Sequence, residues 1–492
     1  MLLRKKFLIR TKYMAIEPSL KQFKTELKRG SVVPVCLNLP ADLETPVSIF
    51  LKLARKKQDA FLLESVELGE QLGRFSLIGI EPEVLAEYRM NKTGNKGFLK
   101  SVKDLLSQFR LSTHLKLPPL IGSFVGFIGY ELVQEFEDIE LKTKKGLPVP
   151  DSVFMFPTNL VVFDHIKHEL KLIHLVVNHK KDSAEKMYQN AERVLSRMRN
   201  ELNQPIPNPV QKKSARSEKL NSNLSKKEFV SIVKRAKEHI RAGDCIQIVL
   251  SQRFDLGKVS DDFQIYRALR SLNPSPYMFY MKHKNFSLVG SSPEVLVKKT
   301  GQLAETRPIA GTRPRGRDED EDLKNEAELR ASKKEMAEHI MLVDLGRNDL
   351  GRVSDPKSVK VEDFARVERY SHVMHLVSVV KAVLKKKISA LDLLQASFPA
   401  GTVTGAPKIK AMQIIDRLER EKRGPYAGSF GYFGLNGDMD MCITIRTIVV
   451  CNGQATVQAG AGIVNDSIPE KEYQETINKA KALMQAVRNS EL

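Results

Sequence analysis

Two pairs of glutamates carry a spacing suited to metal binding. Glu335 and Glu338 are three residues apart in "KKEMAEHIMLVDL", and Glu472 and Glu475 repeat that spacing in "KEYQETINKAK". Residues three apart in a helix share one face, so two such helices that meet would bring their carboxylates together. Mg²⁺ prefers one or two carboxylates completed by water and substrate oxygens. The spacing predicts a magnesium site, against the alternative of two solvated helix faces.

Two glycine-rich stretches could hold an anion. In "PIAGTRPRG" (308–316), Pro308 and Pro314 lack backbone donors and exclude a helix interior, which predicts a shaped loop. "QAGAGIV" (458–464) follows a strand pattern, and its alternating glycines predict a loop whose N–H groups approach a carboxylate or phosphate closely. A Gly-x-Gly pair also marks a bulge or a tight bend, so this signal is weak by itself.

The stretch "YSHVMHLVS" (370–378) supplies the candidate proton-transfer group. It contains His372 and His375 in an apolar setting, where a histidine is usually a core residue. His375 could also act as an acid or base near neutral pH. "AGTVTGAPKIKAMQII" (400–415) lacks the spacing of a phosphate-binding P-loop, so nucleoside triphosphate binding is excluded.

Helices and strands must position these residues. The polar stretch 201–225 predicts a linker between an N-terminal domain (1–200) and a C-terminal domain (226–492). Ser225 and Glu228 form a capping box, residues 325–349 predict one long helix, and Asn452-Gly453 predicts a tight turn. Strand and helix patterns alternate without a regular βαβ order, which favours an α+β fold with antiparallel sheets.

Composition excludes several classes of protein. The 79 Lys and Arg against 59 Asp and Glu leave 79 − 59 = +20, but the lysines are dispersed, which predicts a solvated surface. A nucleic-acid-binding protein is the alternative, and it would bind with a strong salt dependence. The four cysteines lie far apart, which indicates neither zinc nor disulfides and fits a reducing cytoplasm. No apolar run approaches a membrane span. The basic N-terminal stretch lacks the apolar core and cleavage site of a secretion signal, and a start at Met14 is favoured over an organelle transit peptide.

Together these stretches resemble the chorismate-utilising enzymes, and among them the large subunits of anthranilate synthases. The similarity covers nearly the whole chain in order. The matching motifs are "FLLESVELGEQLGRFSLIG", "NPSPYMFY", "VGSSPE", "ETRPIAGTRPRG", "AEHIMLVDLGRNDLGRV", "YSHVMHLVS", "FPAGTVTGAPKIKAM", "RGPYAGSFGYF", "CITIRT" and "VQAGAGIVNDSIPEKEYQET". The resemblance implies a large antiparallel β-sandwich core flanked by helices, with chorismate bound in the C-terminal half.

The resemblance also implies a site. Mg²⁺ would be held by Glu338 and Glu475, with Glu335 and Glu472 beside it. The residues that would bind the chorismate dianion are Gly311, Thr312, Tyr426, Arg446, Gly460, Ala461 and Gly462. Ammonia would add at ring carbon 2, the carbon 4 hydroxyl would leave, and loss of pyruvate would give anthranilate. His375 would transfer protons, with Glu335 as the other candidate, and Thr312 and Gln247 would complete the catalytic set.

Two positions separate the sister activities. Water-adding relatives carry a lysine base where this chain has Gln247, and a neutral amide cannot deprotonate water. Many aminodeoxychorismate synthases carry a lysine at the position of Ala310 in "PIAGT". Both features favour direct attack by ammonia and the ortho-amino product. An aminodeoxychorismate synthase component that makes the 4-amino product for folate is the alternative, since some para-amino enzymes share the alanine.

The resemblance further implies regulation and a partner. "LLES" (62–65) and "NPSPYM" (273–278) resemble a tryptophan feedback site in which Ser65, Pro276, Tyr277 and Met278 contact the inhibitor. The alternative is that "LLES" is only the end of a strand. Because the chain has no glutaminase domain, ammonia would come from a glutamine amidotransferase subunit, in a heterotetramer of two copies of each chain. Neither nucleic acid nor membrane is an expected partner.

Overall fold

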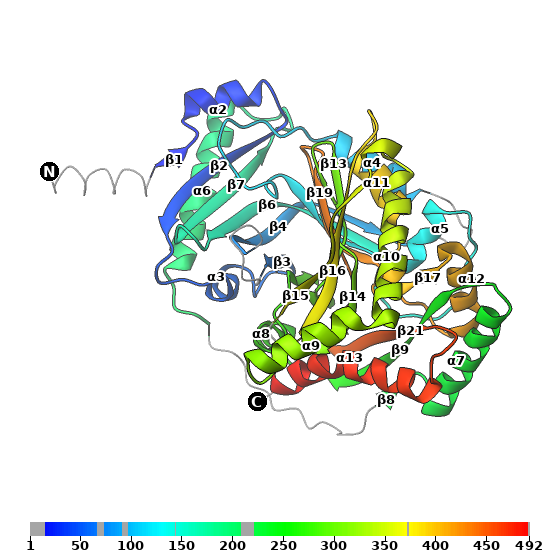
Figure 1. Cartoon of the computed structure of the whole chain (residues 1–492). Coiled ribbons are helices and arrows are strands. Elements are labelled where there is room, and N and C mark those ends of the chain that lie inside the picture. The colour runs from blue at the N-terminus through cyan, green and yellow to red at the C-terminus, as the bar shows by residue number, and fades with distance from the viewer. Residues whose placement is uncertain are drawn as a thin grey trace.

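The computed structural model describes residues 15–65, 73–90, 97–142, 144–207, 221–370 and 373–490 (Figure 1). Helices lie on the outside of a large body of strands. They are α2 (Leu20–Leu27), α3 (Pro46–Leu53), α4 (Phe98–Ser107), α5 (Val133–Phe136), α6 (Ala184–Leu202), α7 (Lys226–Arg241), α8 (Asp262–Leu272), α9 (Glu319–Ala331), α10 (Lys333–Gly351), α11 (Ala390–Ser397), α12 (Lys408–Leu418) and α13 (Pro469–Asn489). Among the described residues, no helix is long and apolar enough to cross a membrane.

The strands form one antiparallel network. They are β1 (Ile16–Glu17), β2 (Val32–Pro40), β3 (Asp59–Glu64), β4 (Phe75–Tyr88), β5 (Ser123–Ile128), β6 (Ser152–Asp164), β7 (Glu169–Val177), β8 (Asn221–Ser222), β9 (Gln247–Lys258), β10 (Tyr277–His283), β11 (Phe286–Ser292), β12 (Val295–Thr300), β13 (Leu303–Thr306), β14 (Ile309–Pro314), β15 (Lys360–Arg369), β16 (Val373–Val383), β17 (Gly405–Ala406), β18 (Ser429–Gly434), β19 (Met439–Ile443), β20 (Thr447–Cys451) and β21 (Gln454–Ile463). The long strand β6 pairs with β4, β5 and β7, so the network branches there.

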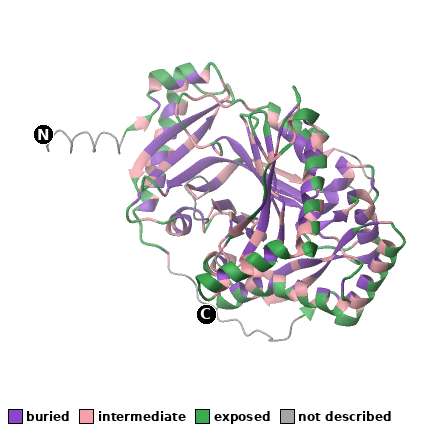
Figure 2. Ribbon diagram, in the orientation of Figure 1, coloured by how far each residue is buried: buried purple, intermediate pink, exposed green. Residues whose placement is uncertain are grey.

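Two limbs of the network leave β6 and pack against each other. One runs through β4, β3, β10, β11, β20, β21 and β9, and the other runs through β5, β18, β19, β12, β13 and β16. Phe279 of the first limb stacks on Phe430 of the second with ring centroids 3.9 Å apart. Most strand residues are buried, whereas the helices expose their outer faces (Figure 2). The predicted α+β fold with an antiparallel sandwich core is confirmed.

Strands from both sides of residues 201–225 pair with one another, since β3 pairs with β10 and β5 with β18. The two halves of the chain therefore share their sheets. Of the predicted linker, residues 201–207 and 221–225 are described, and α6 extends into it as far as Leu202. The domain bounds 1–200 and 226–492 stay a prediction. Met14 and residues 1–13 lie outside the described residues.

Several predicted elements form as expected, and three differ. The Ser225–Glu228 capping box begins α7, and Asn452-Gly453 turns β20 into β21 with both residues at positive φ. The expected single helix over 325–349 is wrong, because Ser332 ends α9 and caps α10 by accepting a hydrogen bond from the Glu335 N–H.

The two glycine-rich segments are strands and not loops. Ile309–Pro314 pairs with β16 as β14, and the register shifts at Gly311, whose φ is +63°. A glycine at positive φ is the usual first residue of a β-bulge. Gly460, Ala461 and Gly462 pair with β9 inside β21. In both cases a partner strand distant in sequence supplies the hydrogen bonds that make the segment a strand.

Candidate active site

Helix α10 carries the first predicted carboxylate pair. Its N-cap, Ser332, fixes the start of the helix, so Glu335 and Glu338 lie one turn apart on the same face. Burial raises the pKa of Glu338, and the charges of Glu335 and Glu475 raise it further. Arg313 lies 3.4 Å from the Glu335 carboxylate. The two α10 carboxylates and Glu475 therefore concentrate negative charge around Glu338, and Arg313 offsets part of it at Glu335.

Helix α13 carries the second pair and lies along β21 at the same end of the molecule as β9 (Figure 1). Glu472 is buried, which raises its pKa, and the neighbouring charge of Glu475 adds to the rise. Lys479 contacts the Glu475 carboxylate at 2.7 Å and donates to the Gly460 carbonyl at 3.1 Å. Glu338 of α10 therefore lies within the field of Glu475 of α13. We call Glu335, Glu338, Glu472 and Glu475 the carboxylate cluster, and their role in binding metal stays a prediction.

Strands β9 and β21 form the floor between these helices. The Gln247 amide donates to the Glu338 carboxylate at 3.2 Å. A Cβ at Gly462 would lie 2.7 Å from the Gln247 amide nitrogen, so the glycine leaves room for that amide. Beyond Val457, β21 pairs only with β9 among the described strands. N–H groups on the free edge of Gly460–Gly462 can therefore face a ligand, although the segment is not a loop.

Arg446 and Tyr426 stand beside this floor. Arg446 has φ +51°, its guanidinium donates to the Lys479 carbonyl, and its own carbonyl accepts from the Ser291 N–H. A Cβ at Gly460 would lie 2.6 Å from the Tyr426 hydroxyl. Burial raises the pKa of Tyr426 to about 12, so its phenol keeps its proton as a hydrogen-bond donor.

His375 faces the bulge in β14. Its Nδ1 lies 2.8 Å from the Gly311 carbonyl and 3.1 Å from the Thr312 hydroxyl. Donation from Nδ1 to the carbonyl leaves Nε2 of the neutral ring to exchange a proton with a ligand. Burial lowers the pKa of His375, and the charge of Arg446 lowers it further. Gly311, Thr312 and His375 therefore join the Arg446 side of the same site, whereas His372 lies outside the described residues.

The arginines of "PIAGTRPRG" brace the chain instead of facing a ligand. Arg315 makes a two-pronged contact with Asp322 of α9, with Nε 2.9 Å from Oδ2, and donates to the Tyr370 carbonyl at 2.8 Å. Ala310 is buried and pairs with Leu376 of β16. A lysine is thus absent where many 4-aminating relatives carry one.

Sequence reasoning missed Glu294 and Lys479. Glu294 ends the motif "VGSSPE" and is only 7% exposed. Burial raises its pKa to about 8, so it holds a proton at neutral pH although the charge of Lys479 opposes this. The motif was a signal, but burial comes from contacts distant in sequence. Lys479, four residues after Glu475, was indistinguishable from a solvent-exposed helix pair.

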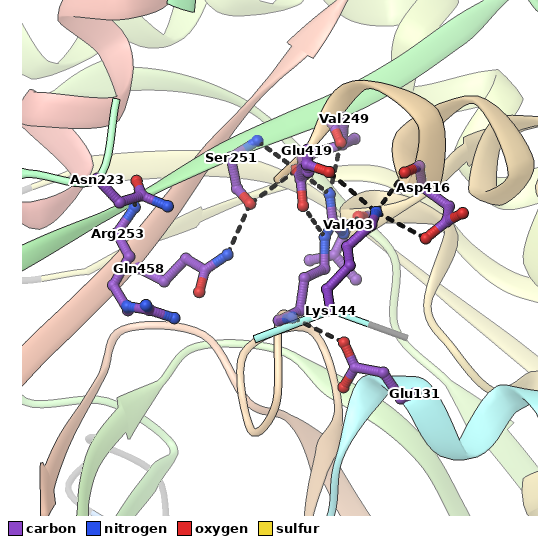
Figure 3. Close-up of polar contacts among 11 residues, drawn as sticks. Glu131, Lys144, Asn223, Val249, Ser251, Arg253, Val403, Asp416, Glu419 and Gln458 are labelled. Atoms are coloured by element: carbon purple, nitrogen blue, oxygen red, sulfur yellow. Dashed lines mark hydrogen bonds and ion pairs between the residues drawn. The ribbon is translucent and has the colours of Figure 1, made fainter. Parts of the chain in front are cut away.

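A network of buried ions holds Tyr426 from behind. Arg423 bonds both oxygens of Glu419, donates to the Val403 and Val249 carbonyls, and lies 5.6 Å from the Tyr426 ring centroid. Glu419 also accepts from Ser251, which faces Gly460 across β9 and β21 (Figure 3). This network ties the turn that carries Tyr426 to the floor of the site.

The residues predicted to bind tryptophan also meet, away from the carboxylate cluster. Ser65 follows β3, whose last residue, Glu64, is the register partner of Met278 in β10. Tyr277 is the neighbour of Met278, and Pro276 directly precedes the strand. The Ser65 hydroxyl is buried without a hydrogen-bond partner among the described residues. The Tyr277 hydroxyl donates to Asp440 at 2.8 Å.

This fold and site define an enzyme class. The chain belongs to the chorismate-binding enzyme family, whose model matches residues 19–485. It is 43% identical to the anthranilate synthase component 1 of Acetivibrio thermocellus over 96% of this chain and 99% of the relative. It is 44% identical to the protein of that name from Aquifex aeolicus, over 97% and 99%.

Solved structures agree with this membership. Anthranilate synthase component I from Streptococcus pneumoniae superposes with a TM-score of 0.75 at 36% identity, over 91% of this chain and 99% of that one. The menaquinone-specific isochorismate synthase of Escherichia coli shares the fold with a TM-score of 0.73 at 20% identity, over 96% and 100%. An anthranilate synthase component and an isochorismate synthase therefore share one architecture, and side chains must distinguish them.

Proposed function

We propose that this protein converts chorismate and ammonia to anthranilate and pyruvate, as the first committed step of tryptophan synthesis. The observation that carries the proposal is the contact between Gln247 and Glu338 beside Gly462. A neutral amide stands at the edge of the carboxylate cluster, where a base would be needed to activate water. Ammonia is already a nucleophile and needs no such base.

The positive and N–H groups of the site suit the substrate's carboxylates. Arg446 and the free edge of Gly460–Gly462 hold the enolpyruvyl carboxylate, and the Tyr426 hydroxyl donates from the same side. Arginine and oriented N–H groups bind carboxylates strongly when water is excluded. Gly311, beside Glu335, and Thr312, beside His375, complete the binding site. The net charge of +20 favours approach of a dianion.

Mg²⁺ fits the carboxylate cluster. Among the described residues, no three His, Cys, Asp or Glu side chains already form a compact metal site. Mg²⁺ does not require one, since it accepts two carboxylates with water and substrate oxygens. Burial chiefly raises the pKa of Glu338, and the charges of Glu335 and Glu475 add to the rise, which a bound cation would oppose. Glu338 and Glu475 would hold the ion, Glu335 and Glu472 would lie beside it, and the ion would supply positive charge to the ring carboxylate.

Protons are handled by Glu294 and His375. Glu294 is protonated near neutral pH and gives its proton to the departing carbon 4 hydroxyl, which leaves as water as the C–O bond breaks. His375, with Nε2 free, takes part in the later proton transfer that accompanies loss of pyruvate; Glu335 is the other candidate. Buried acids and bases whose pKa values lie near the working pH are the most effective catalysts.

Product identification tests the proposed function. The protein is incubated with chorismate, Mg²⁺ and ammonium at alkaline pH, and the products are separated and identified. We expect anthranilate and pyruvate in equal amounts. Accumulation of 4-amino-4-deoxychorismate would assign the protein to folate synthesis instead.

Glu294→Gln is expected to lower kcat by about 100-fold or more, because the amide has no proton to give. In the unaltered protein, kcat at a fixed concentration of uncharged ammonia should fall as the pH rises through about 8, where Glu294 loses its proton. Steady-state assays from pH 6.5 to 9.5, in buffers whose pKa values are about one unit apart, check both effects. An unaltered descending limb in the variant would assign that limb to another group.

The partner and location follow from the proposed chemistry. A glutamine amidotransferase subunit supplies ammonia, in an assembly of two copies of each chain. The "component 1" naming of the relatives implies a second component. The four cysteines are buried and unpaired, which is compatible with a reducing cytoplasm.

Tryptophan feedback acts at Ser65, Pro276, Tyr277 and Met278. Ser65→Phe should weaken tryptophan binding by at least about 10-fold, or about 1.4 kcal/mol, while kcat stays unchanged, because the ring fills the pocket away from the carboxylate cluster. The chain has no tryptophan, so the indole fluorescence of the added ligand reports binding without background. Ser101→Phe, on the exposed side of α4, is the control. Equal tryptophan affinity in both variants would remove Ser65 from the inhibitor site.

A further inference from the structure

A partly open cavity extends from Glu294 along α10. It offers about 40 Å³ to the centres of water molecules. Its polar lining is contributed by Glu294, Thr306, Asp349, Ser397 and Thr402, and Gly346 forms part of the wall. We call this cavity the Asp349 chamber. At about 10–15 Å³ for each water, it has room for about three or four.

The chamber contains an unsatisfied polar group. The Thr402 hydroxyl is buried and makes no hydrogen bond of good geometry among the described residues; its weak contact with Glu294 lowers the pKa of that carboxyl. A buried hydroxyl without a partner loses free energy unless water satisfies it. A polar cavity of this size with several donors and acceptors holds ordered water.

The far end of the chamber leads to a second buried carboxyl. Asp349 is 8% exposed and accepts a hydrogen bond from the Lys408 ammonium at 2.8 Å, which also donates to the Ser397 carbonyl. Arg352 and Glu137, which contact each other at 2.7 Å nearer the surface, both act on the pKa of Asp349. Charged groups thus continue from the chamber toward solvent on the side away from the carboxylate cluster.

We infer that the Asp349 chamber holds a short chain of water molecules through which Asp349 and Lys408 return a proton to Glu294 after each turnover. The inference rests on the proposed function. Glu294 loses one proton to the departing hydroxyl, which becomes water. Its carboxylate then takes a proton from a chamber water, and that water takes one from the Asp349–Lys408 pair, which solvent restores. One proton enters from solvent for each hydroxyl that leaves, so the charges balance.

Glu294 is only 7% exposed, so the chamber offers its carboxyl a route to solvent besides the substrate site. The groups that act on Glu294 from other elements are Lys479 on α13 and Thr402 in the η3 turn (Gly401–Val403). Lys479 is engaged by Glu475 and the Gly460 carbonyl, and a hydroxyl is too weak an acid to donate. Asp349 and Lys408 are the ionisable side chains at the other end of the chamber.

The test separates the first turnover from later ones. In rapid-quench experiments with saturating chorismate, ammonium and Mg²⁺, Asp349→Asn should keep its first-turnover rate within about two-fold and lower its steady-state rate by about 10-fold. The result is a burst of one product per active site, since Glu294 starts each experiment protonated. Asp349→Glu should restore much of the steady-state rate.

Gly346→Ala tests the water chain without touching a charge. Its added methyl group enters the chamber wall, where the nearest atom is Cγ2 of Thr306 at 3.0 Å, and removes room for about one water. The same burst is expected. Unchanged steady-state rates in both variants, or an equal loss in the first and later turnovers, would overturn the relay and leave the proposed function standing. An unaltered protein that makes no aminated product would overturn the proposed function, and the relay with it.

Discussion

Glu338→Gln is expected to lower kcat/KM for chorismate by more than about 100-fold while leaving the fold intact. The amide keeps the size of the side chain and still offers an oxygen to Gln247. It removes a negative charge that would help to hold Mg²⁺. In the unaltered protein that charge is repelled by those of Glu335 and Glu475. Glu475→Gln should have the same effect from the other helix, since its carboxylate would be the second ligand.

The stability of the Glu338 variant distinguishes a binding role from a structural one. A carboxyl whose folded pKa is raised destabilises the folded state increasingly as the pH rises above its unfolded value. Removing that charge should therefore leave the melting temperature at pH 7.5 unchanged or higher. In calorimetry with chorismate present, Mg²⁺ should raise the melting temperature of the unaltered protein but not of the variant. Glu328→Gln, exposed on α9, is the control. Normal turnover in Glu338→Gln would mean that the metal binds elsewhere and that Glu338 is not a ligand.

The carboxylate cluster could be predicted from sequence because its signal is local. A spacing of three fixes two side chains on one helix face, whatever the rest of the chain does. That the faces of α10 and α13 meet was implied only by resemblance, and in the structure Glu338 lies in the field of Glu475. The break at Ser332 was also readable, since a serine three residues before a glutamate is a capping signal. The unbroken helical pattern obscured it.

Sequence patterns gave the wrong answer where backbone partners are distant. "PIAGTRPRG" and "QAGAGIV" contain glycines and prolines that suggest loops, but β16 and β9 supply the hydrogen bonds that make them strands. Glycine serves close approach in these strands: a Cβ at Gly462 would strike Gln247, and one at Gly460 would strike Tyr426. Glu294 escaped notice for a similar reason, because its burial depends on segments more than a hundred residues away, around Thr402 and Ile443.

Arg423→Met is expected to lower the free energy of unfolding by about 3–5 kcal/mol, because it strands the buried Glu419 carboxylate without its partner. Arg423 is 2% exposed, and its guanidinium makes three kinds of contact, with the Glu419 carboxylate, the Val249 and Val403 carbonyls and the rings of Tyr130 and Tyr426. Urea unfolding monitored by circular dichroism measures the loss. KM for chorismate should rise in the folded fraction, since the turn that carries Tyr426 loses its anchor.

Two further variants separate the stranded charge from the lost packing. Arg420→Met removes a nearby arginine whose ion pair with Glu228 lies at the surface, and it should change stability little. In the double variant Arg423→Met with Glu419→Leu, both charges are gone, so much of the lost stability should return, although Ser251 loses its acceptor. A double variant as unstable as Arg423→Met alone would mean that the stability is lost with the contacts to the backbone carbonyls and tyrosine rings, and not through the stranded charge of Glu419. Recovered stability with KM still raised would assign Arg423 a positioning role toward Tyr426 that is separate from its part in folding.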